Sequence, residues 1–124
     1  MENIVITAAA RTPIGTFGGS FRDVLPNELA ATVIKEVVQR SSLTPEQVDE
    51  VILGNCIMRS DEANIARMAA IKAGIPLDVP AFTIQRQCSS GMQAVVSGYQ
   101  EIVLGDTEIV VAGGTEGMSS ALMY

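Results

Sequence analysis

The apolar and polar residues of the chain alternate in blocks whose period changes from one block to the next. Four short apolar runs, rich in valine, isoleucine and alanine, predict buried strands. These runs occupy residues 4–8, 50–54, 81–84 and 108–113. Between them, apolar residues recur every three or four positions, which predicts amphipathic helices. The helical segments are residues 28–40, 62–73 and 89–104.

The ends of these elements carry recognisable signals. Gly74 and Gly105 follow the second and third helical segments, where glycine commonly ends a helix in the left-handed conformation. Thr44, Pro45 and Gln47 have the form of a capping box and predict a short helical turn before the second strand. The order βαβαβαβ predicts an α/β layer of mostly parallel strands, with right-handed crossovers and helices packed on the sheet.

One cysteine stands out because of its setting. Cys88 lies in residues 85–94 (QRQCSSGMQA), between the third strand and the third helix. Unpaired N–H groups and the helix dipole favour negative charge on a first helical turn, and thiols there become thiolate nucleophiles. The small residues Ser89, Ser90 and Gly91 would let a substrate carbonyl approach. A free cysteine is more often a small core residue, but a core position does not need a helix start.

The remaining candidates for chemistry are few. The chain has no histidine, and its second cysteine, Cys56, is accompanied by no CxxC pair. We therefore expect no metal site, and we expect Cys56 to be a buried or half-buried thiol without a catalytic role. Arg67 is either a binding arginine or a structural one that ties loops together through its planar fork. Glu116 has an analogous structural interpretation.

Two glycine-rich segments invite comparison with nucleotide-binding turns. Residues 109–117 run from a strand into glycines, but their spacing is G-G-x-x-G and not G-x-G-x-x-G. Residues 15–20 lack the lysine of a phosphate-binding loop. We interpret both as turns that need small residues.

The charge and termini limit the classes of partner. The net charge is −6 and the eight basic residues are scattered, which argues against nucleic acid or an anionic membrane as a partner. No apolar run has the length of a membrane span, and the first residues lack the basic start of a signal peptide. With only two cysteines, a reducing cytoplasm is the expected location.

Residues 85–94 resemble the N-terminal active-site motif of the thiolases, the family of acetyl-CoA acetyltransferases and 3-ketoacyl-CoA thiolases. Further segments resemble the same family in the same order along the chain. They are the opening loop 9–15, the first helix 28–34, the second strand 51–55, the flanks of the second helix 64–67 and 72–76, and the glycine-rich strand end 110–119. Two positions depart from the family pattern: Gln85 replaces an asparagine and Gly117 replaces a serine.

The resemblance implies a fold and a domain. Residues 1–124 would be the first part of a thiolase N-terminal domain, ending about where an inserted loop domain would begin. The family's catalytic histidine, its second catalytic cysteine and most of its coenzyme A contacts would lie in a further part of the protein. The resemblance also implies a homodimer or a dimer of dimers, formed through the N-terminal halves.

The resemblance further implies an activity in fatty acid metabolism. Cys88 would carry an acyl group taken from an acyl-CoA, with its backbone N–H as an oxyanion donor. Condensation with acetyl-CoA would form a 3-ketoacyl-CoA, and the reverse reaction would cleave one. Coenzyme A thioesters would be the substrates, and no other cofactor is expected.

Alternatives remain beside this hypothesis. Because the chain has no histidine, we expect residues 1–124 to be inactive alone. We also expect them to expose apolar surface, because parallel strands need cover on both faces and the chain offers only three helices of useful length. The chain could instead be a split-thiolase subunit that works beside a histidine-bearing partner, or a non-catalytic interaction module. Among enzymes, a ketoacyl synthase shares the nucleophile, but the opening loop and residues 113–116 favour a thiolase.

Overall fold

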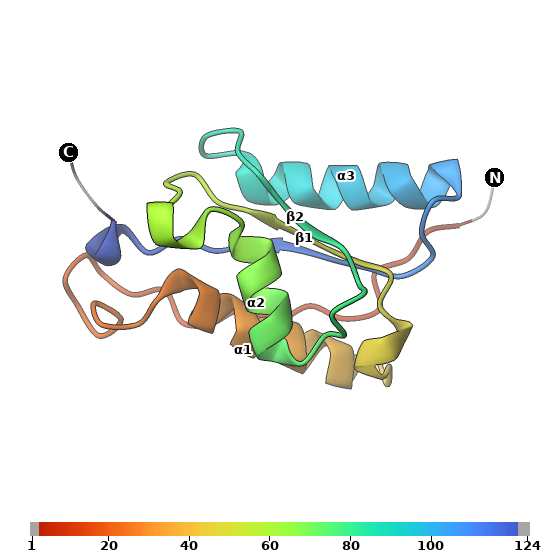
Figure 1. Ribbon diagram of the computed structural model, residues 1–124, viewed down its shortest axis with the longest axis horizontal. Coiled ribbons are helices and arrows are strands. Elements are labelled where there is room, and N and C mark those ends of the chain that lie inside the picture. Colours follow the sequence, from red (N-terminus) through yellow and green to blue (C-terminus); the bar gives the residue numbers. More distant parts are fainter. Residues whose placement is uncertain (1–2, 122–124) are drawn as a thin grey trace.

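A computed structural model describes residues 3–121 and shows a parallel sheet with helices on both faces (Figure 1). The strands are β1 (Glu50–Gly54), β2 (Ala81–Ile84) and β3 (Val110–Gly114), in the order β2-β1-β3. In the central strand, Ile52 pairs with Phe82 on one side and with Ala112 on the other. Residues 51–54 of β1 are buried, which explains their continuous apolar run. The predicted parallel α/β arrangement is confirmed.

Three helices cover the sheet. On one face, α1 (Pro26–Arg40) and α2 (Ile65–Ala73) pack against each other, while α3 (Ser90–Leu104) lies alone on the opposite face (Figure 1). Short 3₁₀ turns occur at Pro45–Gln47, Ser60–Glu62 and Met118–Ser120. The first is the predicted turn, and the Gln47 side chain accepts a hydrogen bond from the Thr44 N–H at 2.8 Å. None of the helices within residues 3–121 is long and apolar enough to cross a bilayer.

The helix ends follow local capping chemistry. Helix α1 begins at Pro26, two residues earlier than predicted, and the Glu28 carboxylate accepts from the N–H of Leu25, the cap residue, at 3.0 Å. Helix α2 begins at Ile65 and not at residue 62, because the Asn64 side chain caps it by accepting from the Arg67 N–H. Gly74 and Gly105 end α2 and α3 with φ of +85° and +82°, as predicted.

The first residue of strand β3 also differs from the prediction. Strand β3 begins at Val110, although the apolar pattern predicted a strand from residue 108. The Asp49 carboxylate accepts from the N–H groups of Glu108 and Ile109 at 2.8 and 2.9 Å, so these groups are occupied before the ladder begins. The acceptor of these two N–H groups is therefore a side chain and not a backbone carbonyl of β1.

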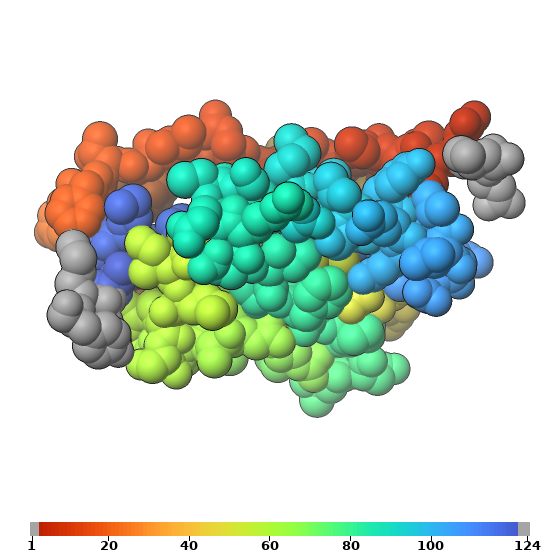
Figure 2. All heavy atoms as spheres, turned by 90° about the horizontal axis from the view of Figure 1, so that it is seen from above, coloured from red at the N-terminus to blue at the C-terminus, as the bar shows by residue number. Residues whose placement is uncertain are grey.

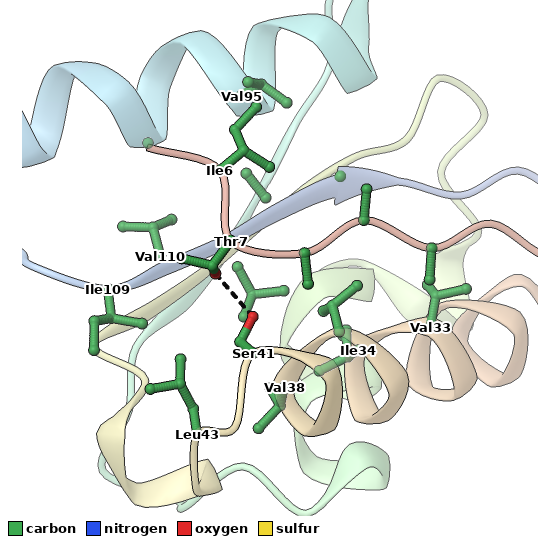
Figure 3. A pocket seen from close by; sticks show the side chains of 18 of the residues that line it. Ile6, Thr7, Val33, Ile34, Val38, Ser41, Leu43, Val95, Ile109 and Val110 are labelled. Atoms are coloured by element: carbon green, nitrogen blue, oxygen red, sulfur yellow. Dashed lines mark hydrogen bonds between the residues drawn. The ribbon is translucent and has the colours of Figure 1, made fainter. Parts of the chain in front are cut away.

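The predicted first strand, residues 4–8, does not join the sheet. An apolar groove of about 500 Å³ lies between this segment, β3, α1 and α3 (Figure 3). The backbone of residues 4–8 makes no hydrogen bond to β3, and an extended segment without such a ladder is not a strand. Side chains of α1 and its end anchor this region instead. The hydroxyl groups of Ser41 and Thr7 form a hydrogen bond at 2.8 Å, and the Arg40 guanidinium donates to the Ala9 carbonyl at 3.0 Å.

The core lies mainly between the sheet and the pair α1–α2. Its largest fully buried apolar side chains are those of Ile34, Val48, Val51, Ile52 and Ile65. Burying each such side chain contributes about 1.5–3 kcal/mol. Ile52 lies on the opposite side of β1 from Val51, because strand residues alternate between the two faces.

Helix α3 packs on the sheet through small residues. Its buried positions are Ser90, Ala94 and Gly98, which let the helix approach closely. The larger apolar side chains of α3 are exposed, and Figure 2 shows the uncovered helix in cyan to blue. They are Met92, Val95, Val96, Tyr99, Val103 and Leu104. The exposed apolar surface expected from the sequence is therefore present.

Candidate active site at the carboxyl ends of the strands

Cys88 lies in the loop that leads from the carboxyl end of β2 into α3. Its thiol is free and exposed. The loops that follow β1 and β3 begin with Asn55 and Thr115, at the same edge of the sheet. In open parallel sheets, ligands bind in the crevice outside this edge. The structure thus places the predicted nucleophile where such folds build their sites.

The helix that follows Cys88 starts later than predicted. Helix α3 begins at Ser90 with Ser89 as its cap residue, so Cys88 precedes the cap and does not lie on the first helical turn. The shift follows from a side chain that closes the loop. The Ser90 hydroxyl donates to the Gln87 carbonyl at 2.6 Å and accepts from the Arg86 N–H at 2.8 Å. The N–H of Cys88 itself donates to no acceptor within residues 3–121.

The residue before Cys88 has an unusual backbone. Gln87 adopts φ of +50°, and a left-handed conformation at a residue with a Cβ costs about 1–3 kcal/mol. Its N–H donates to the Gln85 side chain at 2.8 Å, so the glutamine that replaces the family's asparagine helps to hold this turn. Such strain persists only where surrounding contacts fix it, and it concentrates at functional sites.

Three glycines bring the start of α3 onto the sheet. A Cβ on Gly54, at the end of β1, would lie 2.3 Å from the carbonyl carbon of Ser90. A Cβ on Gly114, at the end of β3, would lie 3.1 Å from the Cα of Gly91. The glycine-rich end of β3 therefore serves close packing beneath the Cys88 loop, and the interpretation of Gly114 as a turn residue is wrong.

Glu116 links two loops at this edge. Its carboxylate accepts from the Cys56 N–H at 2.8 Å, the Ile57 N–H at 3.3 Å and the Asn55 side-chain amide at 3.1 Å. The predicted structural role of Glu116 is confirmed, and Cys56 is half-buried as expected. No local sequence signal shows that Glu116 and Cys56 meet, since 60 positions separate them.

Arg67 also has a structural role. Its guanidinium donates to the carbonyls of Leu77 and Val79 at 2.7 and 2.8 Å. It thereby ties α2 to the segment before β2, as the structural interpretation predicted. Within residues 3–121, no group of three or more histidine, cysteine or acidic side chains could hold a metal ion.

A carboxyl with a raised pKa, that of Glu50, lies at the opposite edge of the sheet. Burial, and then the hydrogen bond and charge of Glu101, raise the pKa of Glu50 to about 7. The charge of Asp106 adds to this effect. Because Glu50 begins β1 and Cys88 follows the end of β2, this carboxyl belongs to the fold and not to the candidate site.

Comparison with known families identifies the class of protein. Residues 4–124 match the thiolase N-terminal domain. The chain therefore belongs to the thiolase family, which confirms the resemblance found in the sequence.

Individual relatives agree with this assignment. A probable acetyl-CoA acyltransferase of Staphylococcus epidermidis is 49% identical over 123 residues, which cover 99% of this chain and 31% of the relative. A protein of the same description from Staphylococcus aureus is 46% identical over the same length. The crystal structure of the Bacillus anthracis acetyl-CoA acetyltransferase matches with a TM-score of 0.95 and 60% identity, over 98% of this chain and 31% of that one. The chain thus spans about a third of the length of these relatives.

Proposed function

We propose that this chain carries the nucleophile of a thiolase, an acyl-CoA C-acyltransferase that forms or cleaves 3-ketoacyl-CoA. The observation that carries the proposal is an exposed, free Cys88 on a strained loop at the carboxyl edge of the sheet, in a chain of this family. The relatives' descriptions as acetyl-CoA acyltransferases and acetyltransferases support acyl-CoA and acetyl-CoA as substrates.

In the first step, the Cys88 thiolate attacks the thioester carbonyl of an acyl-CoA. The carbonyl electrons move onto oxygen and return as the carbon–sulfur bond to coenzyme A breaks. The products are an acyl-cysteine and a coenzyme A thiolate, which takes up a proton. The Cys88 N–H supports this step, because it has no acceptor among the described residues and is available to an oxyanion.

In the second step, a base removes the α-proton of acetyl-CoA and the resulting carbanion attacks the acyl-cysteine. The Cys88 thiolate leaves, and the product is a 3-ketoacyl-CoA. Thiolytic cleavage is the same sequence reversed. Since the acyl group is held covalently between two substrates, the kinetics are expected to be ping-pong.

The base and the activator of the thiol are not supplied by residues 1–124, which contain no histidine. We infer that the 124-residue chain is inactive alone and that the missing groups come from a further part of the same polypeptide or from a partner chain. The threefold greater length of the relatives supports this inference. The homodimer, the cytoplasmic location, the role in fatty acid metabolism and the incomplete N-terminal domain stay predictions from the resemblance.

The test is to locate the acyl group. The full polypeptide that contains these residues is mixed with acetyl-CoA, quenched in acid and digested for peptide mass spectrometry. We expect an acetyl group on the Cys88 peptide, none on that of Cys56, and none at all in Cys88→Ala. A Cys56→Ser variant should still carry its label on Cys88. Acetylation at another residue, or turnover by Cys88→Ala, would overturn the proposal.

The uncovered face of α3 favours a second candidate function, a non-catalytic thiolase-like subunit that docks on a partner. The exposed side chains of Val96, Tyr99 and Val103 are of the kind that interfaces cover. The same labelling experiment on the purified complex decides between the two, because a non-catalytic subunit would acquire no acetyl group at Cys88.

A further inference from the structure

Two consecutive backbone N–H groups in the loop after β1, those of Cys56 and Ile57, donate to the carboxylate of Glu116. Glu116 Oε2 accepts from the Cys56 N–H at 2.8 Å, while Oε1 and Oε2 lie 3.3 and 3.4 Å from the Ile57 nitrogen. Glu116 makes no ion pair with lysine or arginine within residues 3–121. Its charge is therefore directed at these N–H groups, and charge-assisted bonds of this kind are about twice as strong as neutral ones.

The same loop touches the nucleophile loop through a side chain. The Cys56 thiol donates to Gln87 Oε1, with a sulfur–oxygen distance of 3.6 Å. The other hydrogen bonds of Gln87 stay within its own loop or reach the start of α3. Its N–H donates to the Gln85 side chain, and its carbonyl accepts from the Ser90 hydroxyl. Among residues 3–121, Cys56 is thus the hydrogen-bond partner of Gln87 that lies outside the Cys88 loop and α3.

Gln87 immediately precedes Cys88, and its backbone is strained at φ of +50°. A strained residue returns to ordinary φ values when the contacts that hold it are lost. Such a change at Gln87 would rotate the peptide that carries the Cys88 N–H. The position of that N–H and of the thiol therefore depends on Gln87.

We propose that Glu116 is a positioning residue for acylation of Cys88, acting through the Cys56 backbone and the Cys56–Gln87 contact. The proposal rests on the proposed function of Cys88 and adds a residue that no local motif connects with it. Glu116 touches neither substrate nor sulfur in this scheme. Its contribution is to keep the Cys88 loop in the conformation that reacts, and small misplacements of a reacting group cost large factors in rate.

The proposal is tested by pre-steady-state acylation of the full polypeptide with acetyl-CoA, followed by acid quench and mass spectrometry. For Glu116→Ala we expect an acylation rate about 10-fold lower, which corresponds to about 1.4 kcal/mol of transition-state free energy. Glu116→Gln keeps one acceptor oxygen and should lie between Ala and wild type. The KM for acetyl-CoA should change little, because positioning affects the step after binding.

A second measurement separates positioning from a change in thiol ionisation. Alkylation by iodoacetamide needs no oriented carbonyl, so the pH profile of Cys88 alkylation should keep its shape in Glu116→Ala. The matched control is Glu46→Gln, which alters an exposed carboxylate without hydrogen bonds in the described residues and should acylate at the wild-type rate.

The pathway itself is tested with Cys56. Cys56→Ala should slow acylation about as much as Glu116→Ala, and the double variant should be no slower than either, since both break one chain of contacts. Cys56→Ser keeps a donor to Gln87 and should recover most of the rate. These Cys56 variants also test the link if Glu116→Ala does not fold.

The outcomes distinguish this proposal from the proposed function. If wild-type Cys88 acquires no acetyl group, the proposed function is wrong. If Cys88 is acetylated and Glu116→Ala acylates at the wild-type rate, only the positioning role is wrong. Losses that multiply in the Glu116→Ala, Cys56→Ala double variant would likewise overturn the pathway through Cys56.

Discussion

Gly54 and Ser90 are in contact closer than any side chain would allow. A Cβ placed on Gly54 would lie 2.3 Å from the Ser90 carbonyl carbon and 2.4 Å from the nitrogen of Gly91. The end of β1 therefore supports the start of α3 directly, backbone against backbone. Because the Cys88 loop is joined to this helix start by the Ser90 hydroxyl, packing at Gly54 also sets the position of Cys88 above the sheet.

Gly54→Ala should accordingly damage both stability and acylation. The added methyl group has no space, and the cost of such overpacking is typically about 1–3 kcal/mol. We expect a lower denaturant midpoint and, in the folded fraction, slower acetylation of Cys88. Chemical denaturation and the acetylation assay measure the two effects.

Gly105→Ala is the matched control for this prediction. Gly105 has φ of +82° at the end of α3, and a Cβ there would meet nothing within 4 Å. The substitution should cost about 1 kcal/mol through backbone strain alone and leave the acetylation rate of the folded protein unchanged. Equal acetylation rates in the two variants would show that the contact between Gly54 and Ser90 does not position the loop.

The Glu50 carboxyl predicts a dependence of stability on pH. Its folded pKa is raised from 4.5 to about 7, by burial first and then by Glu101 and Asp106. The folded state therefore binds this proton more tightly than the unfolded state does. The associated stability is complete below pH 4.5 and is lost as the pH rises through about 7.

Glu50→Gln tests this dependence, because glutamine has a similar shape and does not ionise. The decline in the denaturant midpoint between pH 4.5 and about 7 should be smaller in the variant than in wild type. Glu108→Gln, at an exposed position near the same edge, should retain the wild-type profile. A Glu50→Gln profile parallel to wild type would assign the pH dependence to other groups.

The outer face of α3 predicts self-association of the 124-residue chain. Val96 and Val103 are 40% and 51% exposed on a face that no described element covers. Replacing both with lysine should lower the association measured by sedimentation velocity, since charges oppose burial of this face. Gln100→Lys adds a charge at an exposed polar position of the same helix and should have a weaker effect. A chain that stays monomeric at all concentrations would contradict the prediction.

Sequence patterns anticipated the features that depend on neighbouring residues. Glycine at positions 74 and 105 predicted helix ends, because only glycine enters the left-handed region without a Cβ penalty, and both residues have φ above +80°. The continuous apolar run in β1 predicted a strand buried on both faces. The setting of Cys88 identified it as the candidate nucleophile, since a strand, small residues and a helix follow one another there.

Tertiary structure decided what depends on distant partners. Residues 4–8 have the composition of a strand, yet a strand exists only where a neighbour completes its ladder, and an apolar groove lies between them and β3. The start of α3 moved to Ser90 because a hydroxyl closed the preceding loop. Glu116 reached the Cys56 N–H across 60 positions, a contact that no local pattern encodes. The sequence alone thus determined most of the elements and the candidate nucleophile, while folding determined the contacts that hold the Cys88 loop in place.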